Sequence, residues 1–163
     1  MADAAANNVA DQVIKITIHP PKLPKGDHET LTIVMHFLRV EIAADDLNIG
    51  QIVYGDRNGG GIDPTTTAAM INYGKTWLLE SFSDESIRTL ISAGQATGPL
   101  VWQRARTVML NDLSVNAAYQ QALNELTYQG NTSILSFYSD FLLISQRVLP
   151  FCHSRAYGSI KFR

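Results

Sequence analysis

The stretch YGDRNGGGIDPTTTAAM, residues 54–70, is the part of the chain that comes nearest to a ligand-binding motif. Glycine-rich loops ahead of a helix cradle phosphate groups, and a lysine that follows directly reaches the terminal phosphates. Here three glycines, residues 59–61, precede a helix-like segment, but the next basic residue is Lys75, well inside that segment. Asp56 and Asp63 flank the glycines and would repel an anion. We interpret the loop as a structural joint, because glycine permits the positive φ angles of a sharp reversal.

The histidines and the single cysteine were considered as metal ligands or as a catalytic pair. His19, His28, His36 and Cys152 do not have the spacing that is typical of zinc motifs. Cys152 and His153 are neighbours, and adjacent side chains of an extended segment point to opposite faces, so they are not expected to form a nucleophile–base dyad. The sequence therefore predicts no catalytic residue, no metal ligand and no cofactor, and hence a protein that is not an enzyme.

Basic side chains interleaved with aromatic ones are the more informative candidates. Trp102 precedes two arginines in WQRARTVM, and Tyr157 and Phe162 lie among the cations of the C-terminal tail. Cations that follow a phosphate backbone and rings that stack on bases are typical of proteins that bind single-stranded nucleic acid. The alternative is a surface balanced by acidic groups, with the aromatic rings in the core. The predicted phosphate contacts are Arg104, Arg106, Arg147, Arg155, Lys161 and Arg163.

The charge of the chain is unevenly distributed. The net charge is −2, but residues 1–100 carry 7 basic and 12 acidic groups, a balance of −5, and residues 101–163 carry 6 basic and 3 acidic groups, a balance of +3. After Asp140 every charged side chain is positive. This asymmetry favours a basic C-terminal contact surface.

The composition favours extensive contact with other proteins. Charged residues make up 17% of the chain, against about 25% in typical globular proteins. Ser, Thr, Asn and Gln together make up about a quarter of it, and such a polar surface costs less to dehydrate than a charged one.

The N-terminus and the apolar segments do not have the patterns of targeting signals. The opening MADAAANNVADQV lacks the basic flank and apolar core of a signal peptide, and no apolar run approaches the length of a membrane span. With a single cysteine, an internal disulfide cannot form. We expect synthesis in the cytoplasm, no membrane contact, and a final location in a virion or another assembly.

The N-terminal third has strand-like patterns. In VIKITIH, residues 13–19, the isoleucines alternate with polar residues, which predicts a half-buried strand. Residues 29–44 fit either a strand with a bulge or an amphipathic helix, and their β-branched content slightly favours the strand. QIVY, residues 51–54, is a further short strand candidate.

The sequence patterns of residues 64–150 predict a series of helices with recognisable ends. The first is expected to begin with Asp63 as N-cap and Pro64 at the first helical position. The next begins at a Ser or Asp cap in SDESIRTLISAG and ends at Gly94. The third helix is expected to carry Pro99 in its first turn, and the fourth to end at Gly130. The fifth is expected to be capped by Thr132 or Ser133 and to end at Pro150.

These patterns predict an α+β fold that is mainly α. An N-terminal β-hairpin or short sheet is followed by a bundle of about five helices, with extended N- and C-terminal arms. We expect one domain over residues 1–163. Its parts are an N-terminal arm (1–11), a strand-rich segment (12–55), a helical body (64–150) and a C-terminal arm (151–163).

The features together favour a self-assembling structural subunit, such as a viral coat or nucleocapsid-type protein. Its partners would be copies of itself and single-stranded nucleic acid. The alternative is a non-polymerising interaction module, such as a phage head–tail adaptor or an intracellular regulator. A nucleotide- or metal-dependent enzyme is the least favoured class.

Overall fold

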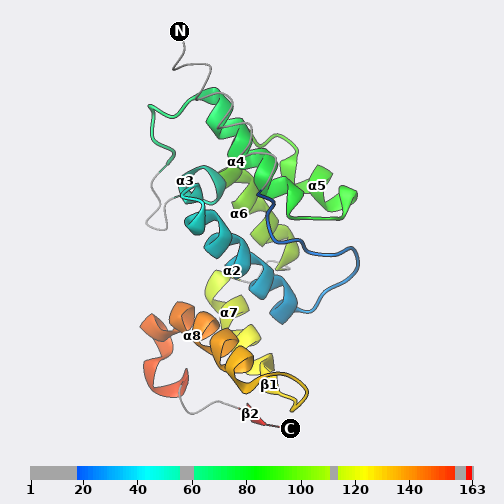
Figure 1. Cartoon of the computed structure of the whole chain (residues 1–163), viewed down its shortest axis with the longest axis vertical. Helices are drawn as coiled ribbons and strands as arrows, with labels where there is room; N and C mark the ends of the chain where they lie inside the picture. The colour runs from blue at the N-terminus through cyan, green and yellow to red at the C-terminus, as the bar shows by residue number, and fades with distance from the viewer. Residues whose placement is uncertain (1–17, 56–60, 111–113, 157–160, 163) are drawn as a thin grey trace.

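A computed structural model describes residues 18–55, 61–110, 114–156 and 161–162 of the chain. The described part is mainly helical, as expected, and its few strand residues lie in one short pair of strands (Figure 1). The predicted N-terminal sheet does not appear there. The elements are α2 (Thr30–Asp46), α3 (Gly50–Val53), α4 (Ala68–Glu80), α5 (Glu85–Ser92), α6 (Gly98–Met109), α7 (Val115–Glu125), β1 (Thr127–Tyr128), α8 (Ile134–Ala156) and β2 (Lys161–Phe162).

Residues 29–44, for which a strand was slightly favoured, form a helix instead. In α2 the six consecutive residues 33–38 are all buried, so the helix is covered on nearly every side. Burial of this kind outweighs the weak β preference of its valines and isoleucines. QIVY is also helical, since α3 occupies Gly50–Val53. The strand predicted over residues 13–19 lies almost wholly outside the described residues.

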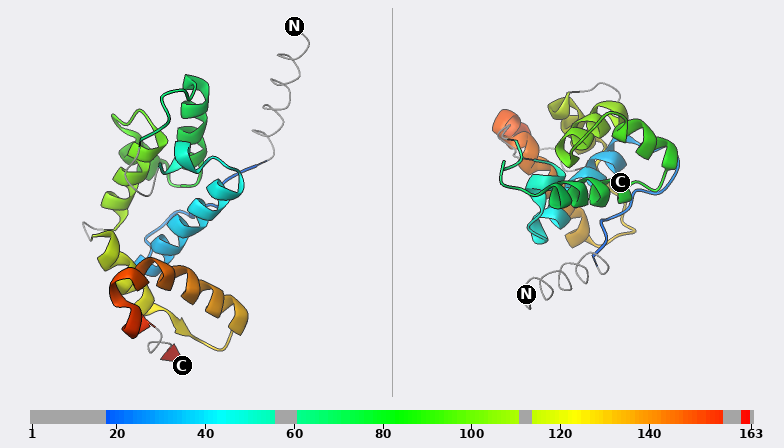
Figure 2. Two further views of the ribbon diagram at one scale, coloured as in Figure 1. Left: turned by 90° about the vertical axis from the view of Figure 1, so that its left-hand side faces the viewer. Right: turned by 90° about the horizontal axis from the view of Figure 1, so that it is seen from above.

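Helix α2 connects two groups of helices, as Figures 1 and 2 show. Helices α3 to α6 pack on one another in the upper half of the view, and α7 and α8 pack on each other in the lower half. Helix α2 contacts α3 in the first group and both α7 and α8 in the second. Aromatic rings join the elements of the upper core: the Phe37 ring lies 4.9 Å from Trp102 and 6.3 Å from Phe82, edge to face in both cases. The long helix is thus the common support of both groups.

The helix after the glycine loop begins later than predicted. Helix α4 starts at Ala68, and its N-cap is Thr67, whose hydroxyl accepts a hydrogen bond from the Met70 amide at 3.3 Å. The Asp63 carboxylate instead accepts hydrogen bonds from the amide and hydroxyl of Thr65, at 2.8 and 2.7 Å. These bonds lower the pKa of Asp63 and form a turn ahead of the helix. The Asp63–Pro64 pair was therefore wrongly predicted as the helix start.

The ends of the two following helices agree with their sequence signals. Asp84 caps α5, and its carboxylate accepts a hydrogen bond from the Ser86 amide at 2.9 Å. Gly94 follows that helix with a φ of 71°, a left-handed conformation that glycine adopts without strain. Pro99 lies in the first turn of α6, where its missing N–H costs no helical hydrogen bond.

The last two helices end elsewhere than predicted. Helix α7 ends at Glu125 rather than at Gly130, because Thr127–Tyr128 turn away as strand β1. Helix α8 continues through Pro150 to Ala156, and its red C-terminal part runs in a different direction from its orange part (Figure 2). Proline removes one helical hydrogen bond and commonly bends a helix without ending it. Part of the predicted C-terminal arm is therefore helical, and its Lys161–Phe162 pair lies parallel to β1.

Candidate functional site

The two arginines of α6 have different surroundings. Arg104 is exposed, and its Nε donates a hydrogen bond to the Leu90 carbonyl oxygen of α5 at 2.8 Å. Arg106 is half-buried, and its buried Nε has no hydrogen-bond partner among the described residues. Arg104 therefore presents its charge to solvent while it joins two helices.

Arg147 already has an acidic partner. Its guanidinium donates a hydrogen bond to Glu41 of α2, whose side chain is buried. The pair joins α8 to α2 across 106 residues of sequence. Nearby, partial burial raises the pKa of Asp140 in α8, and the charge of Arg39 in α2 acts in the opposite direction.

The other predicted contacts lie near the C-terminus. Arg155 belongs to the last turn of α8, Lys161 pairs with Thr127 in the two-stranded sheet, and Arg163 lies outside the described residues. Helix α6 packs on α3, α4 and α5, whereas α8 packs on α7 and α2. The six predicted residues are thus distributed over both helix groups, and their contact with nucleic acid stays a prediction.

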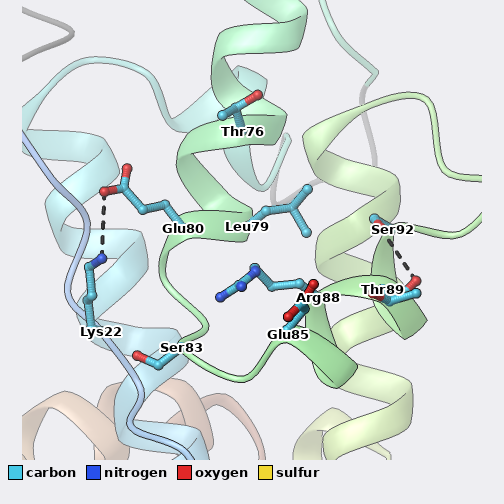
Figure 3. A pocket seen from close by; sticks show the side chains of 9 residues that line it. All are labelled: Lys22, Thr76, Leu79, Glu80, Ser83, Glu85, Arg88, Thr89 and Ser92. Atoms are coloured by element: carbon cyan, nitrogen blue, oxygen red, sulfur yellow. Dashed lines mark hydrogen bonds and ion pairs between the residues drawn. The ribbon is translucent and has the colours of Figure 1, made fainter.

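A groove of about 620 Å³ lies between α4, α5 and the segment before α2 (Figure 3). Its charged side chains contact neighbours: Lys22 Nζ lies 3.6 Å from Glu80 Oε1, and Arg88 Nη1 donates to the Phe82 carbonyl oxygen at 2.6 Å. Serine and threonine hydroxyls and the side chain of Leu79 complete the lining. The groove combines both signs of charge with hydroxyl groups, so it favours no single class of ligand.

Three large apolar side chains are exposed at the start of α8, and the sequence interpretation did not single them out. Leu135 is 75% exposed, Ile134 58% and Tyr138 50%. Their spacing of one and four residues places them on one side of the helix. We call these three residues the α8 apolar face. A neighbouring side of α8 carries a separate stripe, made of Phe137, Phe141, Ile144 and Val148, that is buried in the core.

The stretch of chain that carries the α8 apolar face contains no charged residue. From Leu126 to Ser139, between Glu125 and Asp140, there is no lysine, arginine, aspartate or glutamate. Soluble proteins normally place charged side chains around exposed apolar residues to prevent association. This uncharged stretch is the sequence signal that could have identified the face.

His36, considered above as a metal ligand, is a buried residue of helix α2. Its Nε2 lies 3.3 Å from the Ser81 hydroxyl, and its ring stands edge-on to Phe82 at 5.1 Å. Burial lowers the pKa of His36 from 6.5 to about 4, and the charges of Arg39 and His28 act in the same direction. The described residues contain no group of three or more His, Cys, Asp or Glu that could hold a metal ion.

Stability is expected to fall as the solution is acidified through the range set by His36. The unfolded chain takes up a proton near pH 6.5 and the folded chain near pH 4. The stability that neutral His36 contributes is therefore present above pH 6.5 and lost progressively between these values. Between pH 8 and pH 5 the free energy of unfolding should fall by about 2 kcal/mol from this group.

Urea denaturation of His36→Gln between pH 8 and pH 5 measures this effect. The variant should lose most of the decline, while Ser81→Ala, which keeps the imidazole, should retain it. An equally steep decline in His36→Gln would show that other groups cause it.

No protein-family model matches the chain, no curated protein is similar to it, and no solved structure resembles it. Within the described residues, none of the helices combines the length and apolar character needed to cross a bilayer.

Proposed function

We propose that the chain is a structural subunit that assembles with copies of itself, as viral coat proteins do, and that it contacts single-stranded nucleic acid through basic side chains. The observation that carries this proposal is the α8 apolar face. Ile134, Leu135 and Tyr138 are exposed together, in a stretch of chain without charge.

The energetics of the face support association. Burying one large apolar side chain contributes roughly 1.5–3 kcal/mol, so a contact that covers three supplies a substantial part of a protein–protein affinity. Aromatic residues such as Tyr138 are enriched in interfaces because a ring buries much area at a small cost in side-chain entropy. Serine, threonine and asparagine side chains around the face are cheaper to dehydrate than charges.

Sedimentation velocity over a range of protein concentrations tests assembly. We expect species that grow with concentration, and association at least tenfold weaker in Leu135→Gln. Ser136→Gln, an exposed position on another side of the same helix, is the matched control and should associate like the wild type. A monomer at all concentrations, with and without RNA, would contradict the proposal, and a fixed small ring or dimer would favour a non-polymerising interaction module.

Binding of single-stranded RNA is expected to weaken with salt in proportion to the number of phosphate contacts. Each contact contributes a slope of about −0.7 in a plot of log K against log salt concentration. Arg104 is the exposed member of the predicted set on α6, so Arg104→Gln should make the slope shallower by about that amount.

Fluorescence anisotropy with a labelled RNA at several salt concentrations measures the slope. Lys75→Gln removes one positive charge of α4 outside the predicted set, and it should leave the slope unchanged. Equal slopes for all three proteins would exclude Arg104 as a phosphate contact. Absence of binding at low salt would contradict the nucleic-acid part of the proposal and leave self-assembly to be judged by sedimentation.

A further inference from the structure

We infer that the α8 apolar face is the docking site for residues 13–18 of a second copy of this chain. The inference rests on the proposed self-assembly and deepens it, since it names the two surfaces that meet.

The receiving surface is the second apolar side of an amphipathic helix. Helix α8 buries Phe137 and Phe141 on one side, where α7 and α2 cover it. Ile134, Leu135 and Tyr138 lie on another side of the helix, which the described residues leave largely uncovered. These three residues are 50–75% exposed. An extended segment with one apolar side is a suitable occupant, because it places side chains on such a face at every second residue.

The docking segment has the matching pattern. Residues 13–18 read VIKITI, with Ile14, Ile16 and Ile18 on one face and polar residues between them. The other stretches outside the described residues are residues 1–12 (MADAAANNVADQ), DRNGG, NDL, YGSI and the final arginine, and none of them has an apolar face of period two. The occupant is therefore predicted to be the N-terminal segment.

The residues that follow this segment are attached to the end of α4 by hydrogen bonds of His19 and Leu23. His19 Nδ1 lies 2.6 Å from Glu80 Oε1 at the end of α4. A little further on, the Leu23 amide donates to the Ser81 carbonyl oxygen at 2.8 Å, and the Ser83 amide donates to the Leu23 carbonyl oxygen at 3.1 Å. Ile18, the described residue at the end of this segment, therefore lies next to a fixed position beside α4.

This position indicates docking between copies rather than within one. Five residues span at most about 18 Å when fully extended. Figures 1 and 2 place the blue start of the described chain beside α4, in the upper helix group, and α8 in the lower group at the other end of α2. A neighbouring copy can present its α8 apolar face to the segment directly. Such a contact joins two different surfaces, so it propagates into a ring or a filament.

Disulfide trapping between different copies tests the inference. In a Cys152→Ser background, one preparation carries Ile16→Cys and the other Leu135→Cys, and the two are mixed under mild oxidation. We expect a disulfide-linked dimer in the mixture, at least fivefold above the amount in either preparation alone. Leu100→Cys replaces Leu135→Cys in the matched control, since Leu100 is an exposed apolar residue of α6, and it should give little product.

The outcomes separate this inference from the proposed function. Cross-linking of Leu135→Cys with itself would indicate that two α8 apolar faces pair, and equal product with Leu100→Cys would indicate unspecific contact; both overturn the inference and leave self-assembly intact. Absence of cross-linking in a preparation that still assembles overturns it as well. If the wild type does not assemble at all, the proposed function has failed and the docking contact with it.

Substitutions in the segment provide a second measurement. Ile14→Asn combined with Ile16→Asn should weaken association at least tenfold by sedimentation, with unchanged circular dichroism. Lys15→Gln combined with Thr17→Asn alters the opposite face and should have little effect. Equal association of both double variants would overturn the inference.

Discussion

Replacing either Gly74 or Gly98 with alanine is expected to lower the free energy of unfolding by about 3 kcal/mol. Both glycines are buried, and both face the same backbone atom of α3. A Cβ at Gly74 would lie 2.3 Å from the carbonyl oxygen of Ile52, and a Cβ at Gly98 would lie 2.2 Å from that oxygen. These distances are far below van der Waals contact, and a backbone group cannot move aside as a flexible side chain can.

The two glycines explain how a helix as short as α3 is held. Helices α4 and α6 approach its backbone at Gly74 and Gly98, and the Ile52 and Val53 side chains are buried in the core. Alanine would raise the helix propensity at Gly74 by about 1 kcal/mol, but separating α3 from α4 would expose part of the core. The steric cost is therefore expected to exceed the gain in propensity.

Urea denaturation followed by circular dichroism measures both variants. Gly61→Ala is the matched control, because a Cβ at Gly61 meets no atom of the described residues within 4 Å, and its free energy of unfolding should stay within about 0.5 kcal/mol of the wild type. Wild-type stability of Gly74→Ala and Gly98→Ala would show that α3 does not lie between α4 and α6 in this way.

The parts of the fold that could be predicted from sequence are those determined by neighbouring residues. Asp84 and Gly94 bound α5, and Pro99 lies in the first turn of α6, because capping hydrogen bonds and backbone preferences act within one turn. Residues 29–44 were assigned to the wrong class because their helix depends on α3, α7 and α8, which cover it from several sides. The close approach of α3 to Gly74 could not be predicted either, because the sequence around a helical glycine does not reveal which other element packs against it.

In the candidate site, too, some features follow from the local sequence and others only from the packing of distant elements. Arg104 and Arg147 were grouped because both are basic, but only the fold reveals that Arg147 contacts an acid 106 positions away. In α8 the stripe that contains Phe137 and the face that contains Leu135 both have helical spacing. Sequence periodicity identifies two apolar sides, and only the packing of α7 and α2 decides which of them is covered.

Arg147→Met is expected to lower the free energy of unfolding by about 3 kcal/mol, because it removes the cation beside a buried carboxylate. The Glu41 side chain is 6% exposed and the Arg147 side chain 26% exposed, so water screens the pair only in part. Methionine retains much of the aliphatic volume of arginine, so the loss should arise mainly from electrostatics. The consequence is a weakened attachment of α8 to α2.

A double-mutant cycle isolates this interaction. Glu41→Gln and Arg147→Met should each destabilise the protein, and the double variant should lose less than the sum of both by about 1–3 kcal/mol. Arg104→Met is the control, because the exposed guanidinium binds a carbonyl oxygen, and its cost should stay below about 1 kcal/mol. Additive losses in the cycle would show that Glu41 and Arg147 do not stabilise one another.

The same variants separate a structural role of Arg147 from a role in binding nucleic acid. If Arg147 acts only through Glu41, RNA affinity measured well below the unfolding transition should be the same for Arg147→Met as for the wild type. Arg104→Gln should show the reverse pattern, with weaker RNA binding and little loss of stability. A fall in RNA affinity in Arg147→Met that is accompanied by a shallower salt slope would identify its guanidinium as a phosphate contact in addition to its place beside Glu41.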